Sequence, residues 1–432
     1  MIIYVVQDGD TIKSIADKFQ VSETSLIRSN GIVYPNNLVV GQTIVIAYPE
    51  ETYTVKDGDT LDGIASKYGI PIMQLYRNNP FLWEREYIYP GEALIIKYDT
   101  KMSIATNAYA FPFIDNDILK KSLPYLTYLS ILNYKTLRRG EIESFYDDTE
   151  LVAITKEYGV LPLMLVTSVT FRGERSPEMI YEILLNPSYQ ETHAQSMLKV
   201  LKEQGYYGVN ITITYLNETN HELYINYFKR VASILNKEGY PVFVTIDPNF
   251  NREDNQVTFE KVDFSSYTNI IDQAYLMRFF WGTSYGPPMP VSSINNIKLY
   301  LDFMLQTFES SKTNIGFPLL GYDWELPYVE ETSAANSITL DTANALARMM
   351  NSTIYFDEVS KTPYFQYTVN ENGTLVDHMV WFVDARAINE IVNMVLENKL
   401  SGTGLWNIMV YYPWFWLIIN SNFNIIKLLP EF

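Results

Sequence analysis

Residues 208–220, GVNITITYLNETN, predict a buried strand of β-branched residues that runs into a polar loop. Similar apolar runs recur after residue 102, and stretches with helical periodicity lie between most of them, for example 194–204, 220–237, 293–308 and 387–398. The predicted strands are 103–111, 125–134, 160–168, 207–215, 240–247, 270–279, 314–320 and 402–408. This alternation predicts an α/β fold, a (β/α)8 TIM barrel over 102–432 with an α+β insertion at about 330–380. A doubly wound open sheet is the alternative architecture.

The N-terminal part of the chain repeats one short pattern. YVVQDGDTIKSIADKF at 4–19 returns as YTVKDGDTLDGIASKY at 53–68. In each copy a β-branched strand ends at Asp-Gly-Asp-Thr, and two short helices and a returning strand follow. The pattern predicts two small βααβ modules, 1–48 and 49–98. So short a module has a thin core, which favours binding over catalysis.

Composition excludes several classes of function. A net charge of −18 argues against nucleic acid and anionic lipid surfaces as partners. The chain has no cysteine, and none of its three histidines pairs with another at metal-ligand spacing, so no metal site is expected. Its N-terminus does not resemble a secretory signal. The apolar run 408–419, IMVYYPWFWLII, is too short to span a membrane and is expected to be a buried strand followed by an aromatic surface segment.

The repeated modules resemble LysM domains. The Asp-Gly-Asp-Thr turn, the Ile-Ala helix, the Asn after the second helix and the final Gly-x-x-(Ile/Leu)-x-Ile strand carry this resemblance. It implies binding of N-acetylglucosamine-containing glycans, peptidoglycan or chitin, between two loops of each module. Carried onto this chain, the implied glycan-binding residues are Gly9, Asp10, Thr11, Ile12, Asn30, Gly31 and Ile32, and Gly58, Asp59, Thr60, Leu61, Asn79, Pro80, Phe81 and Leu82. The alternative is that these residues only form turns and helix caps.

The predicted barrel resembles glycoside hydrolase family 18. The similar stretches are NAYAFPFI, GYYGVNITITY, GFPLLGYDW, WFVDARAI and GTGLWNI, in that order. With the LysM modules in front, the whole chain is similar to the spore cortex-lytic N-acetylglucosaminidases. The resemblance implies hydrolysis next to N-acetylglucosamine, in which a glutamic acid protonates the leaving oxygen and the acetamido group of the sugar attacks. It implies no metal or organic cofactor.

The catalytic motif of that family is degenerate in this chain. The family pattern D-G-x-(D/N)-x-D-x-E falls on 207–214, where Asn210 fits, but Thr212 replaces the aspartate and Thr214 replaces the acid. A threonine hydroxyl has no proton to give near neutral pH. In the predicted sixth strand, LMRFFW, the family's tyrosine is replaced by Phe279. Two acids elsewhere, Glu218 and Asp247, are the candidates for a substitute carboxylate.

Aromatic residues at or near the predicted strand ends could bind sugar rings without a catalyst. They are Tyr109, Trp281, Tyr322, Trp324 and Trp406, and Trp406 matches the tryptophan on which the family stacks the sugar. The alternative is that these rings only fill the barrel mouth.

These observations predict a peptidoglycan-binding protein with a catalytically inactive barrel. The alternatives are an active N-acetylglucosaminidase that uses a substitute carboxylate, and a structural spore coat protein. The expected partners are peptidoglycan or a similar glycan and, in addition, spore coat proteins. The resemblance places the protein in the spore cortex or coat or in the cell wall, made in the mother cell without a signal peptide.

Overall fold

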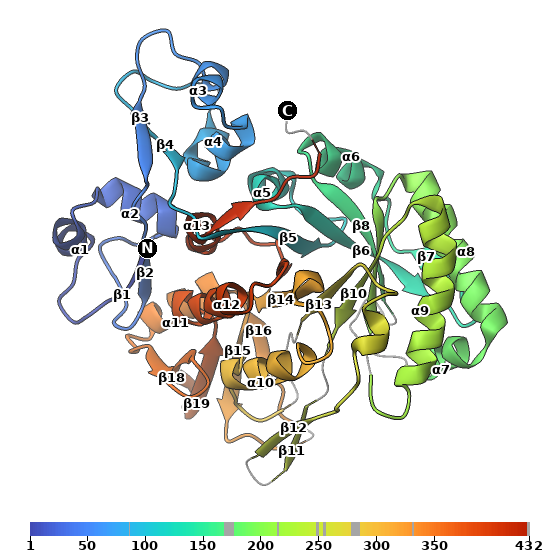
Figure 1. Cartoon of the computed structure of the whole chain (residues 1–432). Helices are drawn as coiled ribbons and strands as arrows, with labels where there is room; N and C mark the ends of the chain where they lie inside the picture. Colours follow the sequence, from blue (N-terminus) through green and yellow to red (C-terminus); the bar gives the residue numbers. More distant parts are fainter. Residues whose placement is uncertain are drawn as a thin grey trace.

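The structure is a computed structural model, and it describes residues 1–85, 87–167, 177–213, 216–247, 250–253, 256–277, 286–330 and 332–429. Two small N-terminal modules lie beside one large barrel (Figure 1). The predicted fold class is therefore confirmed.

The two modules have the same element order. Module 1 contains β1 (Ile2–Val5), α1 (Ile12–Phe19), α2 (Glu23–Asn30) and β2 (Thr43–Ile46). Module 2 contains β3 (Glu51–Thr54), α3 (Leu61–Tyr68), α4 (Ile72–Asn78), the 3-10 helix η1 (Pro80–Glu84) and β4 (Ala93–Lys97). In each module the first and last strands pair antiparallel, β1 with β2 and β3 with β4.

The barrel is a closed ring of parallel strands. Around the ring they are β5 (Met102–Ala110), β6 (Tyr128–Thr136), β8 (Leu161–Thr167), β9 (Gly208–Ile213), β10 (Val242–Ile246), β13 (Gln273–Leu276), β14 (Thr313–Pro318) and β20 (Gly402–Trp406). β20 pairs with β5 and β5 pairs with β6, so the sheet has no open edge there and the doubly wound alternative is wrong. Every predicted barrel strand overlaps one of these strands.

Helices surround this ring, and short strands extend it. The helices are α5 (Asn116–Ser122), α6 (Thr149–Glu157), α7 (Pro177–Leu185), α8 (Pro187–Gln204), α9 (His221–Leu235), α10 (Ile294–Met304), α12 (Ala385–Asn398) and α13 (Pro413–Asn422). The 3-10 turns are η2 (Leu123–Tyr125), η3 (Asn236–Glu238), η4 (Ser265–Tyr267) and η5 (Ser310–Lys312). The short strands are β7 (Ile142–Ser144) beside β6, β21 (Phe423–Ile425) beside β5, and the hairpin β11 (Phe250–Glu253) with β12 (Gln256–Phe259).

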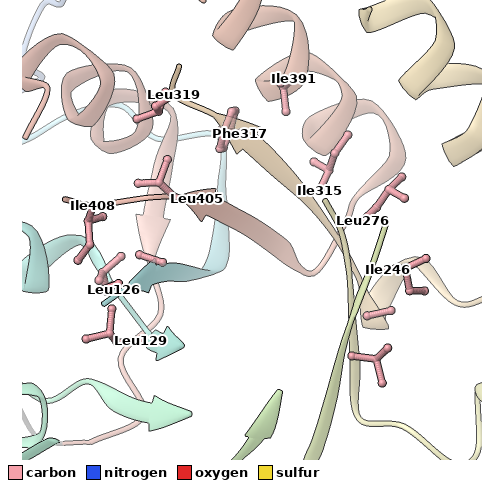
Figure 2. Packing of buried hydrophobic residues seen from close by; sticks show 14 of the residues in the cluster. Leu126, Leu129, Ile246, Leu276, Ile315, Phe317, Leu319, Ile391, Leu405 and Ile408 are labelled. Atoms are coloured by element: carbon pink, nitrogen blue, oxygen red, sulfur yellow. The ribbon is translucent and has the colours of Figure 1, made fainter. Parts of the chain in front are cut away.

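Alternate strand residues divide the core into two layers. Outward-facing side chains pack against the helices, and in Figure 2 Ile391 of α12 lies near Ile315 and Phe317 of β14. Inward-facing side chains form a separate interior cluster that includes Tyr109, Phe243 and Tyr275. This alternation is the period of two that a β-strand imposes.

A second, antiparallel sheet follows β14. It contains β15 (Gly321–Leu326), β16 (Asn336–Ile338), β17 (Tyr355–Asp357), β18 (Thr362–Glu371) and β19 (Thr374–Phe382), together with helix α11 (Leu340–Met349). β15 is a middle strand of this sheet, so the insertion includes residues ahead of its predicted start at 330.

The prediction for residues 408–419 was wrong. Most of that segment lies in helix α13, which begins at Pro413. Proline fits the first helical position because its missing N–H has no partner there and its φ is already suitable. In the described part of the chain, no helix is both long and apolar enough to cross a membrane.

Module 1 is packed firmly onto the barrel. Val39 and Val45 are 4% and 1% exposed and belong to the same hydrophobic cluster as the barrel residues. The amide of Ile354, in the insertion, donates to the carbonyl oxygen of Val40 at 2.9 Å. At Gly41, which has φ +88°, a Cβ would overlap the carbonyl oxygen of Ile354. Module 1 therefore keeps a core of its own but is anchored in the barrel cluster through Val39 and Val45.

Buried His193 gives a prediction for the pH dependence of stability. Its ring lies 3.0 Å from the Tyr227 hydroxyl and is 4% exposed, and burial lowers its pKa from 6.5 to about 4. The unfolded chain takes up this proton first as the pH falls, so the stabilising contribution is present above pH 6.5 and is lost toward pH 4. Between pH 7 and pH 5 we expect a loss of about 2 kcal/mol in the free energy of unfolding from this group. Urea titrations at both pH values measure it, and His193→Gln should remove most of the difference.

The control for that measurement is His221→Gln, since the His221 side chain is 26% exposed. This variant should keep the pH dependence of the unmodified chain. An unchanged pH dependence in His193→Gln would contradict the assignment.

Candidate glycan-binding site

The inner wall of the barrel carries a cluster of neutral hydrogen-bonding groups around Asn210. Its Nδ2 donates to the Tyr109 hydroxyl at 3.1 Å and to Ser130 Oγ at 3.0 Å, and its Oδ1 accepts from Thr245 Oγ1 at 2.8 Å. Asn210 is fully buried. Burial also raises the pKa of Tyr109, so its hydroxyl stays protonated at neutral pH. Within the described residues, every group bonded to Asn210 is uncharged.

Thr212 lies two residues beyond Asn210 on β9, so the strand period puts it on the same side. It is opposite Thr245 of β10 in the strand register and is partly exposed. The structure thus places a hydroxyl at this inward position of β9. Thr214, Phe279 and Trp281 lie outside the described residues.

The two candidate substitute acids differ in their surroundings. Glu218 lies in the loop before α9 and is exposed. Asp247 directly follows β10 and is 8% exposed, and its amide donates to Ile213 at the end of β9 at 3.4 Å. Asp247 is therefore the carboxylate of the two that lies at the end of the barrel strands.

A further acid, Asp323 of β15, is held inside the insertion. Its Oδ2 accepts from the Tyr367 hydroxyl at 2.6 Å, and its Oδ1 lies 3.0 Å from Nδ1 of His378. Asp323 and His378 are 7% and 6% exposed. These contacts fit a structural role in the sheet.

Aromatic rings form a continuous row at the barrel mouth. The row runs from Trp406 to Phe111 (6.1 Å between ring centroids), to Phe113 (5.2 Å) and to Tyr146 (5.6 Å). Phe113 and Tyr146 are 53% and 44% exposed. We call these four residues the mouth ridge. Sugars bury the apolar faces of their rings on such surfaces.

Sequence reasoning named Trp406 but missed the other three residues of the mouth ridge. Phe111 and Phe113 belong to the NAYAFPFI stretch, directly after β5, and this position was an available signal. Tyr146 follows β7, a short strand that the sequence did not predict.

Three of the predicted aromatic residues pack inside the protein. Tyr109, Tyr322 and Trp324 are 1%, 4% and 1% exposed, and Trp324 Nε1 donates to the carbonyl oxygen of Gly286 at 2.9 Å. These rings fit the packing alternative and have no open face for a sugar in this structure. Trp406 is partly exposed and lies 5.7 Å from the Tyr109 ring, so it links the barrel interior to the mouth ridge.

The predicted first loops of the two modules are built alike. Asp10 accepts from the Tyr4 hydroxyl at 2.7 Å, and Asp59 accepts from the Tyr53 hydroxyl at 2.8 Å. Both aspartates also accept a backbone N–H of the turn. These bonds hold the pKa of Asp59 below its usual range. The aspartates therefore fix the shape of the loop.

The threonines and glycines of these loops remain at the surface. Thr11 and Thr60 cap α1 and α3 by accepting a backbone N–H at 3.0 Å. Gly9 and Gly58 have φ +81° and +82° and nothing within contact distance of a Cβ. Ile12 is 3% exposed and belongs to the core of module 1, whereas Leu61 is partly exposed. The loop backbone is therefore the accessible part.

The asparagines of the second loops are structural. Asn30 bonds both the N–H and the carbonyl oxygen of Val45, at 2.7 and 2.8 Å, and Asn79 does the same with Ile95 at 2.8 Å each. Each asparagine thereby joins its second helix to its last strand and is buried. Leu82 is also buried, whereas Gly31 is exposed and Ile32, Pro80 and Phe81 are partly exposed.

The fold and the site define a class of protein in which two small βααβ modules precede a (β/α)8 barrel with an inserted antiparallel sheet. The model for glycosyl hydrolases family 18 matches residues 167–409, and the LysM domain model matches residues 4–47 and 53–97. The chain belongs to glycosyl hydrolases family 18 and carries two LysM domains.

Relatives resemble the chain over its full length. It is 32% identical to the "Cortical fragment-lytic enzyme" of Bacillus subtilis over 99% of both chains. Among solved structures, the spore cortex-lytic enzyme SleL of Bacillus cereus is 27% identical, with a TM-score of 0.79, over 99% of this chain and 98% of that one. A chitinase from Chromobacterium violaceum, at 16% identity and a TM-score of 0.64 over 74% of this chain and 98% of that one, shares the fold.

Proposed function

We propose that this chain binds N-acetylglucosamine-containing glycan, above all peptidoglycan of the bacterial spore or cell wall, without hydrolysing it. The observation that carries the proposal is the presence of Thr212 at an inward position of β9, beside the neutral cluster around Asn210. A hydroxyl and an amide can hold a sugar by hydrogen bonds, but neither donates a proton to a leaving oxygen at neutral pH. In the sequence, Thr214 likewise stands where the family pattern has the glutamic acid that donates the proton.

The binding role is supported by surfaces outside the catalytic position. Both modules keep the backbone of their first loops at the surface, and the mouth ridge offers exposed rings beside Trp406. Because a glycan strand is long, several weak contacts along one rigid molecule add up to useful affinity. The relatives named cortex-lytic enzymes support peptidoglycan as the glycan and the spore as the location.

The barrel's share of this binding gives a testable prediction. Replacing Phe113 and Tyr146 together with alanine removes two exposed rings of the mouth ridge and should weaken binding to purified cortex peptidoglycan by about tenfold. Sedimentation binding curves with the full chain measure the effect. The control is Tyr355→Ala, because Tyr355 is 57% exposed on β17, outside the mouth ridge. If Tyr355→Ala weakens binding to peptidoglycan equally, the mouth ridge is not part of the glycan-binding site.

A second candidate function is hydrolysis with a substitute carboxylate. Asp247 favours it, because this acid directly follows β10 and is 8% exposed. The names of the lytic relatives also favour it. Asp247→Asn should abolish turnover if this acid acts as the catalyst. A coat role of the barrel, with spore coat proteins as partners, predicts that the same sedimentation assay shows no loss of binding when Phe113 and Tyr146 are replaced.

A further inference from the structure

Module 1 and the barrel enclose a cleft of about 160 Å³. On one side it is lined by the loop after α2, including Ile32 and Tyr34. On the other side it is lined by Asn344 and Arg348 of α11 and by Trp414 of α13. We infer that this cleft is a glycan subsite, in which module 1 and the barrel jointly bind one residue of a neutral β-linked amino-sugar chain. The inference rests on the proposed function and adds a site to it.

The cleft continues the predicted glycan-binding loop of module 1. Gly31 and Ile32 belong to that loop and also line the cleft. Gly31 has φ +64°, and a Cβ there would lie 3.1 Å from the ring of Pro413, so the loop backbone lies directly against the start of α13. A glycan chain bound at this loop would therefore also contact the adjacent start of α13.

The cleft has the mixed chemistry that sugars need. The Trp414 ring is partly exposed, and Tyr34 is 55% exposed. Arg348 is held in place, because its Nε donates to the carbonyl oxygen of Asn37 at 3.1 Å and its guanidinium lies 4.4 Å from the centre of the Tyr34 ring. Asn344 and Asp341 also line the cleft and can accept hydrogen bonds from hydroxyl or acetamido groups. Aromatic faces with a few fixed polar groups are typical of ligand sites.

Charge and size favour a neutral chain over a compact anion. Two aspartates, Asp341 and Asp384, line the cleft with one arginine, Arg348, and Asp384 is paired with Arg386 at 2.7 Å. The whole chain carries a net charge of −18. A volume of 160 Å³ is also below the roughly 300–1,000 Å³ of an enclosed small-molecule pocket, so one unit of a longer chain fits the cleft better than a separate small ligand.

Module 2 has a different arrangement at the equivalent loop. There Trp83 follows the loop and stacks on Tyr76 at 4.2 Å and on Tyr158 of the barrel at 5.7 Å. Leu82 is 2% exposed. Aromatic packing thus occupies the contact between module 2 and the barrel, and the two modules are not equivalent.

The test is calorimetric binding of chitohexaose, the soluble β-1,4-linked hexamer of N-acetylglucosamine, to the full chain. Trp414→Ala removes the ring from one wall and should weaken binding by roughly tenfold. Ala345→Trp places a bulky ring into the cleft from an exposed position of α11, so it should weaken binding without disturbing the core. Its matched control is Met349→Trp on the same helix, where Met349 is 70% exposed and does not line the cleft.

The outcomes separate this inference from the proposed function. Weaker binding in Trp414→Ala and Ala345→Trp, with Met349→Trp unchanged, supports the shared subsite. Binding by the unmodified chain that neither cleft variant alters overturns the subsite and leaves glycan binding in place. Absence of binding by the unmodified chain overturns both.

Discussion

Cortical fragments incubated with this chain are expected to keep their length while the protein sediments with insoluble peptidoglycan. Positions 212 and 214 of the motif carry hydroxyls instead of carboxylic acids. A general acid contributes about 10²–10⁴-fold to such a reaction, and loss of charge stabilisation slows it further. The measurement is the release of reducing sugar, with the cortical fragment-lytic enzyme of Bacillus subtilis assayed alongside as the active comparison.

A gain-of-function variant sharpens this expectation. Thr212→Asp combined with Thr214→Glu supplies both carboxylates of the family pattern and should raise any residual rate by at least about 10²-fold. Turnover by the unmodified chain at the rate of the comparison enzyme would contradict the proposal. In that case the variants Asp247→Asn and Glu218→Gln identify the catalytic acid, because Asp247 and Glu218 are the two candidates for a substitute carboxylate.

Alanine at Gly41 is expected to destabilise the protein much more than alanine at its repeat counterpart, Gly91. Both glycines precede the last strand of a module and have similar φ, +88° and +90°. A Cβ at Gly91 meets nothing within contact distance, so Gly91→Ala should cost about 1–2 kcal/mol from backbone conformation alone. A Cβ at Gly41 would overlap the Ile354 carbonyl oxygen, and we expect Gly41→Ala to cost about 2 kcal/mol more.

Urea unfolding followed by tryptophan fluorescence and by far-UV circular dichroism measures both variants. Coincident transitions by the two probes are expected, because Val39 and Val45 of module 1 pack into the hydrophobic cluster of the barrel. Equal losses of stability in the two variants would show that the contact between Gly41 and Ile354 does not constrain the fold.

The sequence was sufficient to predict the barrel and the modules, because their patterns are local. Each barrel strand is a short, largely buried segment bounded by turn residues, as in 208–213, and the Asp-Gly-Asp-Thr turn marks each module. The assignment of 408–419 failed because an apolar run without polar alternation fits a strand or a buried helix equally well. The residue that indicates a helix here is Pro413, because proline is favoured at the first position of a helix.

The remaining features depend on contacts between distant segments. Phe113 and Tyr146 meet across two loops, and their sequence separation gives no sign of the contact. Val39 is buried in what the sequence presents as a loop, and the next residue, Val40, accepts a hydrogen bond from Ile354 of the insertion, more than 300 residues later. Tyr322 and Trp324 are buried in β15 of the inserted sheet, whereas the sequence placed them only at or near the end of a barrel strand.

The anchoring of module 1 in the barrel cluster through Val39 and Val45 has a consequence for the proposed binding of a glycan layer. A binding module on a flexible tether searches all directions, and its effective concentration near a second site falls with tether length. Here contacts such as the hydrogen bond between Ile354 and Val40 fix the orientation of module 1 on the barrel, so under the proposed function both surfaces would contact glycan strands in one relative orientation. A peptidoglycan layer with aligned strands should therefore hold it far more tightly than the same mass of randomly oriented fragments.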